Sequence, residues 1–168
     1  MSIISGLGTV PAFMGGGYIK EMTQSLPAMT GNSAPSGHTA FAKDIYGGGY
    51  EAFRAFNNNL TDFWHSGTFS SFIGRSGPSA IRVWRYRIYP RPGNYPQFPP
   101  AWTFEGSNDG STYTTLDTRS GQSVSSNIFV DYDVPEANRG EYSYHRLNCT
   151  SSTYIALAEI QLLQEVLQ

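Results

Sequence analysis

The chain has 168 residues, enough for one domain with its own hydrophobic core. Charged residues make up only 14% and aromatic residues 14%, and the formal net charge of -2 gives no electrostatic support for a nucleic-acid partner. The single cysteine, Cys149, excludes an internal disulfide and is expected to be buried, and no segment approaches the roughly 18 uninterrupted apolar residues of a membrane span.

The N-terminal segment, residues 1–19, is glycine-rich and has no hydrophobic periodicity. We therefore expect a flexible arm or anchor there, followed by one domain over residues 20–168. The segment lacks the basic start of a signal peptide, so none is predicted. The glycine run at 47–49 predicts a turn or hinge, and the stretch 50–66 predicts a short helical or irregular piece before a polar, asparagine-rich loop.

The strongest strand signal is "AIRVWRYRIYPR", residues 80–91. Trp84, Tyr86 and Ile88 share one parity in this segment, and we expect them to face inward. Turns recur about every 10 residues after it, which is typical of an antiparallel β-sandwich. The further predicted strands are "AWTFEG", "TYTTLDT", "SNIFVDYDV", "YSYHRLNCT" and "YIALAEIQLL".

The stretch "WTFEGSNDGSTYTTLDTRSG" predicts a hairpin, because "GSNDGS" supplies residues that tolerate positive φ. Its strands place Trp102 and Phe104 on one face, with Leu116 opposite them.

Several blocks carry a family resemblance: "AFNNNLTDFWHS" (55–66), "RIYPR" (87–91), "AWTFEGSNDGSTYTTLDTRSG" (101–121), "YHRLNCTSS" (144–152) and "IALAEIQLL" (155–163). In this order they resemble the discoidin-type domain, also called the coagulation factor type C domain. That family belongs to the galactose-binding-like group, which includes many bacterial carbohydrate-binding modules. The resemblance implies an all-β fold, an antiparallel jelly-roll sandwich of about eight strands with binding loops at one end.

The chain departs from the family pattern in two places. The terminal cysteines of animal members are absent, which points to a phage or bacterial branch. Asparagines at 57–59 replace the usual Asp-Gly-Asn of the first loop.

The resemblance also implies a structural Ca²⁺ that joins the first loop to the last strand. Its ligands would be the carbonyls of Arg54 and Ala158 and the side chains of Asn57, Asn59, Asp62 and Glu159. Ca²⁺ takes six to eight oxygen ligands of these kinds. The alternative is a metal-free loop in which Asn57 forms Asx-turn bonds and Glu159 caps backbone amides.

A sugar site combines an aromatic platform with a few polar side chains. By resemblance, the loops at one end of the sandwich would supply the ligand-binding residues His65, Arg91, Asn94, Tyr95 and Phe98. The alternatives are packing of Tyr95 and Phe98 against the sandwich, a surface salt bridge for Arg91 and a structural role for His65.

The sequence contains no recognisable arrangement of catalytic residues. The chain has three histidines, and no Ser-His-Asp or Cys-His arrangement stands out. The fragment "PSGH" lacks the flanking segments that its phosphatase motif needs. Arg82, Arg85 and Arg87 predict a solvated or protein-contacting sheet face. We therefore expect no enzyme.

These observations predict a non-catalytic module that binds a cell-surface glycan, on the surface of a bacteriophage virion as a tail or capsid decoration protein. The arm would attach it to virion structural proteins, without membrane insertion, and homo-oligomer formation stays open. The alternative is a purely structural decoration or assembly protein whose loops bind neighbouring subunits.

Overall fold

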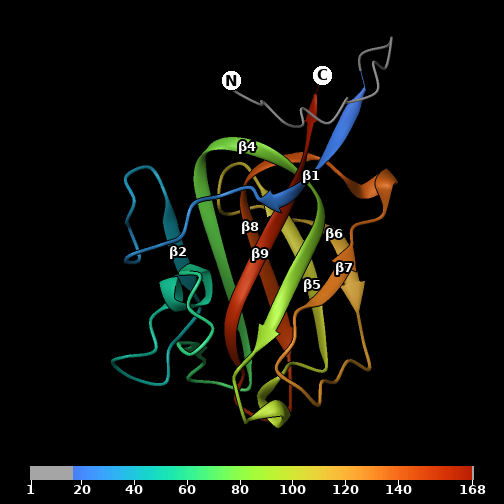
Figure 1. Ribbon diagram of the computed structural model, residues 1–168. Helices are drawn as coiled ribbons and strands as arrows, with labels where there is room; N and C mark the ends of the chain where they lie inside the picture. The colour runs from blue at the N-terminus through green and yellow to red at the C-terminus, as the bar shows by residue number, and fades with distance from the viewer. Residues whose placement is uncertain (1–16, 168) are drawn as a thin grey trace, which may run out of the picture.

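The computed structural model describes residues 17–167 and confirms an all-β fold (Figure 1). One curled sheet of nine strands has the main order β1-β9-β4-β8-β5-β6, with β2 and β7 on β4 and β3 on β9. No helix of the described residues is long and apolar enough to cross a membrane. The strands are β1 (Tyr18–Gln24), β2 (Thr39–Ala42), β3 (Trp64–His65), β4 (Ser70–Pro90), β5 (Ala101–Ser107), β6 (Thr114–Arg119), β7 (Val130–Asp133), β8 (Glu141–Thr150) and β9 (Ala156–Leu167), with short 3-10 helices η1 (Ala52–Phe56), η2 (Tyr95–Gln97) and η3 (Glu136–Asn138).

Strand β1 includes the last two residues of the predicted arm, residues 1–19. Residues 1–16 of the predicted arm lie outside the described residues, and Tyr18 and Ile19 already form the start of β1. Strand β1 pairs antiparallel with β9, so residues 18–24 add an edge strand to the sheet.

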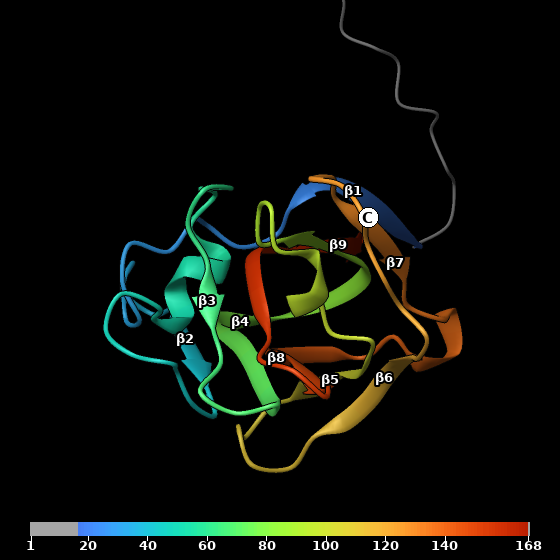
Figure 2. The same ribbon diagram turned by 90° about the horizontal axis from the view of Figure 1, so that it is seen from below.

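Strand β4 belongs to both layers of the sandwich. Its residues 70–76 pair with β8, as do Ile81 and Arg82, and those from 73 to 76 also pair with β2. Its residues from 82 to 90 pair with β9, and those from 85 to 88 also pair with β7. The pairing with β8 shifts register between Ser76 and Ile81, a segment that contains Pro78, which has no N–H to donate. Seen from below, β1, β7 and β9 lie on one side and β5, β6 and β8 on the other (Figure 2).

An aromatic stack fills the space between the layers. Tyr86 lies 4.3 Å from Phe104 and 5.3 Å from Tyr132 between ring centroids, and Trp102 meets Tyr132 edge-on at 5.0 Å. The Tyr86 hydroxyl donates to Asp117 Oδ2 (2.7 Å) and accepts from Trp102 Nε1 (2.9 Å). The polar groups of Tyr86 and Trp102 are therefore hydrogen-bonded, and each buried ring contributes roughly 1.5–3 kcal/mol.

Trp84 differs from the prediction for its strand. Tyr86 and Ile88 face the core as expected, but the register with β9 shifts between Val83 and Arg85, so Val83 enters the core in its place. Trp84 is buried under β1, where its Nε1 donates to the carbonyl of Glu21 (3.0 Å). A β-bulge explains the change, because an extra residue reverses which parity faces inward.

The predicted hairpin is present as β5 and β6. Gly110 supplies the positive φ of its turn, +70°. Asp109 Oδ1 accepts hydrogen bonds from the backbone N–H groups of Ser111 (2.8 Å) and Thr112 (2.7 Å). Trp102, Phe104 and Leu116 are all buried in the core, as is Cys149.

Candidate functional site

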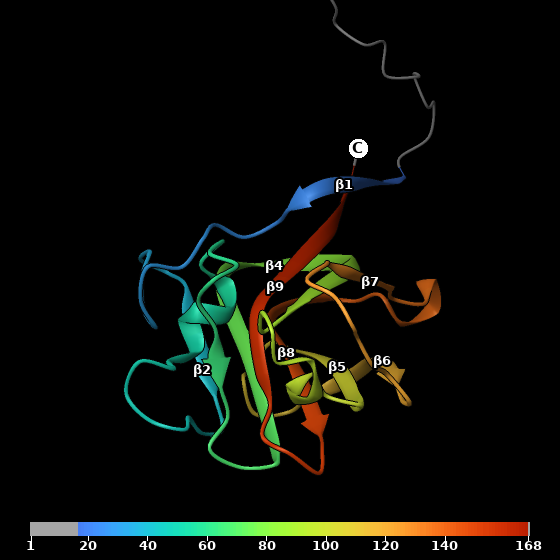
Figure 3. The same cartoon turned by 60° about the horizontal axis from the view of Figure 1, so that its bottom comes forward.

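The loops at one end of the sandwich gather a cluster of ring side chains, which we call the aromatic rim. This end carries η2 and the turn from β8 to β9, opposite to β1 and the last residues of β9 (Figures 1 and 3). The aromatic rim consists of Tyr46, Tyr50, Phe63, His65, Phe69 and Tyr154.

Tyr46 and Tyr154 are the exposed centre of the aromatic rim. They meet edge-on, with 5.3 Å between centroids, and are 60% and 36% exposed. His65 lies beneath both, 4.8 Å from Tyr46 and 5.6 Å from Tyr154, and is itself buried. Phe69 packs edge-on against Tyr154 at 4.9 Å and is also exposed. The result is an open apolar surface on a fixed base.

A chain of hydrogen bonds runs along the side of the rim. Arg91 Nη1 donates to Gln97 Oε1 (2.8 Å), and Gln97 Nε2 lies 3.1 Å from His65 Nε2. His65 Nδ1 lies 2.9 Å from the carbonyl oxygen of Ser66, an acceptor that requires the proton on Nδ1. His65 Nε2 is therefore the acceptor for Gln97. The Arg91 guanidinium also stacks on Phe63, 4.3 Å from the ring centroid.

Asp44 anchors the loops that carry the rim. Its carboxylate accepts from Gly67 N (3.0 Å), Ser71 Oγ (2.8 Å) and Thr68 Oγ1. Burial alone would raise the pKa of Asp44, but these hydrogen bonds, with that from Thr68 the strongest, lower it below its usual value. Gly67 is required for this close approach, because a Cβ there would lie 2.8 Å from the carbonyl oxygen of Ile45.

The predicted ligand residues separate into two groups. His65 and Arg91 belong to the hydrogen-bonded chain, and Asn94 and Tyr95 are half-buried at the start of η2 beside it. Phe98 lies in the core, where it packs edge-on against Trp102 at 5.8 Å and offers no exposed face.

Sequence reasoning missed Tyr46, Tyr154 and Gln97. A signal for the first was present, because the glycine run at 47–49 is flanked by tyrosines at 46 and 50. A glycine-rich turn lets the backbone bend tightly and presents its flanking side chains together. Tyr154 and Gln97 had no local signal, because β3 and β9 must pair, His65 opposite Ala156, before these loops meet.

The predicted metal residues lie together where the first loop meets β9. Glu159 is fully buried, and its Oε2 accepts from the backbone N–H of Asn58 (2.9 Å), while its Oε1 has no hydrogen-bond partner in the described part of the chain. Burial raises the pKa of Glu159 to about 8. Asp62 Oδ2 is held by Arg54 (2.6 Å) and Asn57 Nδ2 (3.1 Å).

One oxygen of this donor set is suited to bind a hard cation. The buried oxygen of Glu159 lacks a partner, and carboxylate and amide oxygens are the ligands that Ca²⁺ prefers. The amide oxygens of the loop, in contrast, already accept hydrogen bonds. Asn57 Oδ1 accepts from the backbone N–H of Asn59 (2.9 Å), and Asn59 Oδ1 accepts from the backbone N–H (3.1 Å) and hydroxyl (2.8 Å) of Thr61. Residues 17–167 hold no group of three or more His, Cys, Asp or Glu side chains placed to bind a metal, so amide and carbonyl oxygens would have to complete the site.

Comparison with known proteins identifies solved domains of the same fold. No model of a protein family and no curated protein matches the chain. Among solved structures, the family 32 carbohydrate-binding module of NanJ from C. perfringens, solved in complex with galactose, superposes with a TM-score of 0.64 at 16% identity, over 77% of this chain and 95% of that one. Chitosan-binding module 1 of a chitosanase/glucanase from Paenibacillus sp. IK-5 gives 0.60 at 24% identity, over 75% and 94%.

An F5/8 type C domain from Bacteroides fragilis gives a TM-score of 0.65 at 11% identity, over 77% of this chain and 93% of that one. Each similarity spans nearly the whole of the other domain, so the shared part is the complete sandwich and not a fragment of it. The chain therefore has the fold of the discoidin-type domains and family 32 carbohydrate-binding modules, as its sequence blocks predicted.

Proposed function

We propose that this protein is a non-catalytic carbohydrate-binding module that takes a sugar at the aromatic rim. The observation that carries the proposal is the exposed pair Tyr46 and Tyr154 beside the fixed chain of Arg91, Gln97 and His65. The rings offer apolar faces for a sugar ring, and the polar chain offers directional groups for its hydroxyls. The neighbours of the same fold that are named for galactose and chitosan support a glycan as the ligand class.

The test is a calorimetric titration of the protein with galactose and with chitosan oligosaccharides, repeated on Tyr154→Ala. We expect the substitution to weaken binding by at least about tenfold, because an aromatic anchor at the centre of a site carries much of the binding energy. Tyr18→Ala is the matched control, since Tyr18 is a similarly exposed tyrosine on β1 at the other end. Equal affinities for the wild type and both variants would disprove the rim as the site.

Within this function we further propose a place on the surface of a bacteriophage virion, attached through the N-terminal side. The arrangement supports it, because β1 and the end of β9 lie opposite to the rim, so attachment there leaves the rim facing outward (Figure 1). The rival role is structural decoration, in which the rim loops grip neighbouring subunits. Cryo-electron microscopy of virions that carry the protein separates the two, since a rim buried against a subunit supports only the rival.

We also propose that Ca²⁺ binds at the first loop, held by Glu159 with Asp62 and nearby carbonyls. The bound ion would neutralise the buried carboxylate and join the first loop to β9. We expect Ca²⁺ to raise the melting temperature and EDTA to lower it, and expect neither to act on Glu159→Gln. A melting temperature of the wild type that ignores both reagents rules the ion out.

A further inference from the structure

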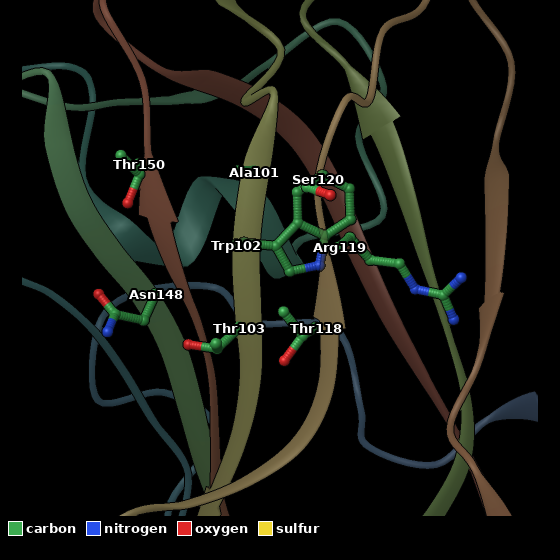
Figure 4. A pocket seen from close by; sticks show the side chains of 8 residues that line it. All are labelled: Ala101, Trp102, Thr103, Thr118, Arg119, Ser120, Asn148 and Thr150. Atoms are coloured by element: carbon green, nitrogen blue, oxygen red, sulfur yellow. The ribbon is translucent and has the colours of Figure 1, made fainter.

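The outer face of β5, β6 and β8 carries a groove of about 330 Å³ that is separate from the aromatic rim (Figure 4). Thr150, one of its lining residues, ends β8, and Tyr154 of the rim lies in the turn that follows. The outward-facing side chains that line it are Ala101, Thr103, Thr118, Ser120, Asn148 and Thr150.

The strand register explains the hollow. Thr103 of β5 pairs with Asn148 on one side and with Thr118 on the other, and Ala101 pairs with Thr150. Directly paired residues share a face of the sheet, so these short side chains form adjoining rows. With strands about 4.8 Å apart, the face spans about 10 Å across, which matches one to two sugar rings.

The groove is polar but its outward side chains carry no charge. Arg119 turns its guanidinium away to Asp117 Oδ2 (2.6 Å) and to the carbonyl oxygen of Asp133 (2.9 Å), and Figure 4 shows it pointing away from Thr103 and Asn148. The exposed groups are hydroxyls and one amide, which both donate and accept hydrogen bonds. Sugar hydroxyls have this same dual character, whereas a charged ligand would find no counter-charge here.

A buried carboxylate holds the groove in shape. Glu105 is only 7% exposed; its Oε1 accepts from Thr103 Oγ1 (2.6 Å) and Asn148 Nδ2 (3.4 Å), and its Oε2 accepts from Arg146 Nε (2.6 Å). Arg146 is itself fixed over Tyr113, with its guanidinium 3.6 Å from the ring centroid. One N–H of the Asn148 amide is engaged by Glu105, so its second N–H and its Oδ1 remain to meet a ligand.

We propose that this groove is a second saccharide-binding site, which takes the hydroxyl-rich face of an uncharged sugar. The inference rests on the proposed function for its ligand class, but it concerns different residues. Thr103 and Asn148 are its central hydrogen-bonding residues, and Glu105 is a positioning residue.

The test is a titration of the ¹⁵N-labelled protein with galactose, lactose and chitotriose at millimolar concentrations, followed by amide chemical shifts. We expect saturable shifts at residues 103, 118 and 148 that are separate from those at 46, 65 and 154. The double variant Thr103→Val and Asn148→Ala should weaken the groove response by about tenfold, through loss of its hydrogen bonds, and leave the rim response unchanged. Thr114→Val, an exposed threonine of β6 that does not line the groove, is the matched control.

Each outcome decides between the two sites, once the melting temperatures show that the variants fold. Shifts confined to the rim overturn the second site and leave the proposed function standing. Shifts confined to the groove support the second site and count against the rim. Groove shifts that survive the double variant, or the absence of groove shifts with all three sugars, overturn the inference.

Discussion

The two ends of the sandwich both carry aromatic side chains, but they differ in whether a cationic side chain lies over the ring faces. At the end that holds β1, Lys20 and Arg85 lie over Trp84, at 4.9 and 4.6 Å, and Arg82 lies over Tyr18 at 4.6 Å. At the other end, Arg91 covers Phe63, but no cation of residues 17–167 lies over the exposed rings of Tyr46 and Tyr154. Aromatic content alone therefore does not mark a ligand site, because a ring covered by a protein cation has already used the face that a sugar would need.

The largest expected effect comes from a substitution at the end that holds β1, where cations cover the rings. Trp84→Ala removes a buried indole and its hydrogen bond to Glu21, so we expect a loss of about 3 kcal/mol in the free energy of unfolding. Urea denaturation measures the loss, and a sugar titration on the same variant should show unchanged affinity. A stability loss below about 1 kcal/mol would mean that Trp84 is not the anchor of β1.

The next largest effect is expected from a substitution beside the aromatic rim. Gln97→Ala breaks the link between Arg91 and His65, and we expect about tenfold weaker sugar binding with little change in melting temperature, because the polar groups lose their fixed orientation. Calorimetry gives the affinity, and thermal unfolding is the control. Unchanged affinity would leave the aromatic rings as the whole of the site.

A pH experiment tests the core histidine, His145, whose surroundings differ from those of the rim histidine. Both ring nitrogens of His65 have partners, whereas those of His145 have none in the described residues, and burial, followed by the charge of Arg75, lowers the pKa of His145 to about 3. A lowered pKa means that His145 adds stability above its unfolded value of 6.5, and that this contribution is lost as the pH falls from 6.5 toward 3.

The buried Glu159, whose pKa is raised to about 8, acts in the opposite sense, since it stabilises below 4.5 and loses that contribution as the pH rises toward 8. The informative quantity is therefore the difference between wild type and His145→Leu. We expect the variant to gain on the wild type by up to about 1.4 kcal/mol per pH unit below pH 6.5. A difference in unfolding free energy that is constant from pH 7 to pH 4 contradicts the assignment.

The smallest effect concerns the ion pairs between β4 and β7 on the sheet surface. Arg87 pairs with Asp131 at 2.7 Å, but both side chains are about one-third exposed. Arg87→Ala should therefore cost less than about 1 kcal/mol, and less again at high salt. Urea denaturation at low and high ionic strength checks this, and a larger loss would show that the sheet face with Arg82, Arg85 and Arg87 stabilises the fold.

Much of the fold could be predicted because its signals are local. The alternation at 80–91 and the turn before Ser111 both identify elements from a few residues. Residues 70–79 escaped prediction because "SSFIGRSGPS" reads as turn-forming sequence, although its first part pairs with β2 and β8 in the interior. Arg75 in this segment is only 1% exposed, a burial that no polar-outside pattern predicts.

The site could be predicted only in part for the same reason. His65 and Arg91 lie in blocks with a recognisable pattern, whereas Tyr46 and Tyr154 meet only after β3 and β9 have paired. The bulge at Trp84 could not be predicted either, because the alternation of side chains in β4 does not show where its pairing with β9 leaves out a residue.

The passage of β4 through both layers has a consequence for unfolding. One continuous backbone supplies hydrogen bonds to β2 and β8 at its start and to β7 and β9 at its end. Neither layer can therefore peel away without disrupting the other, so amide hydrogens at both ends of β4 should exchange with solvent only through the same global opening.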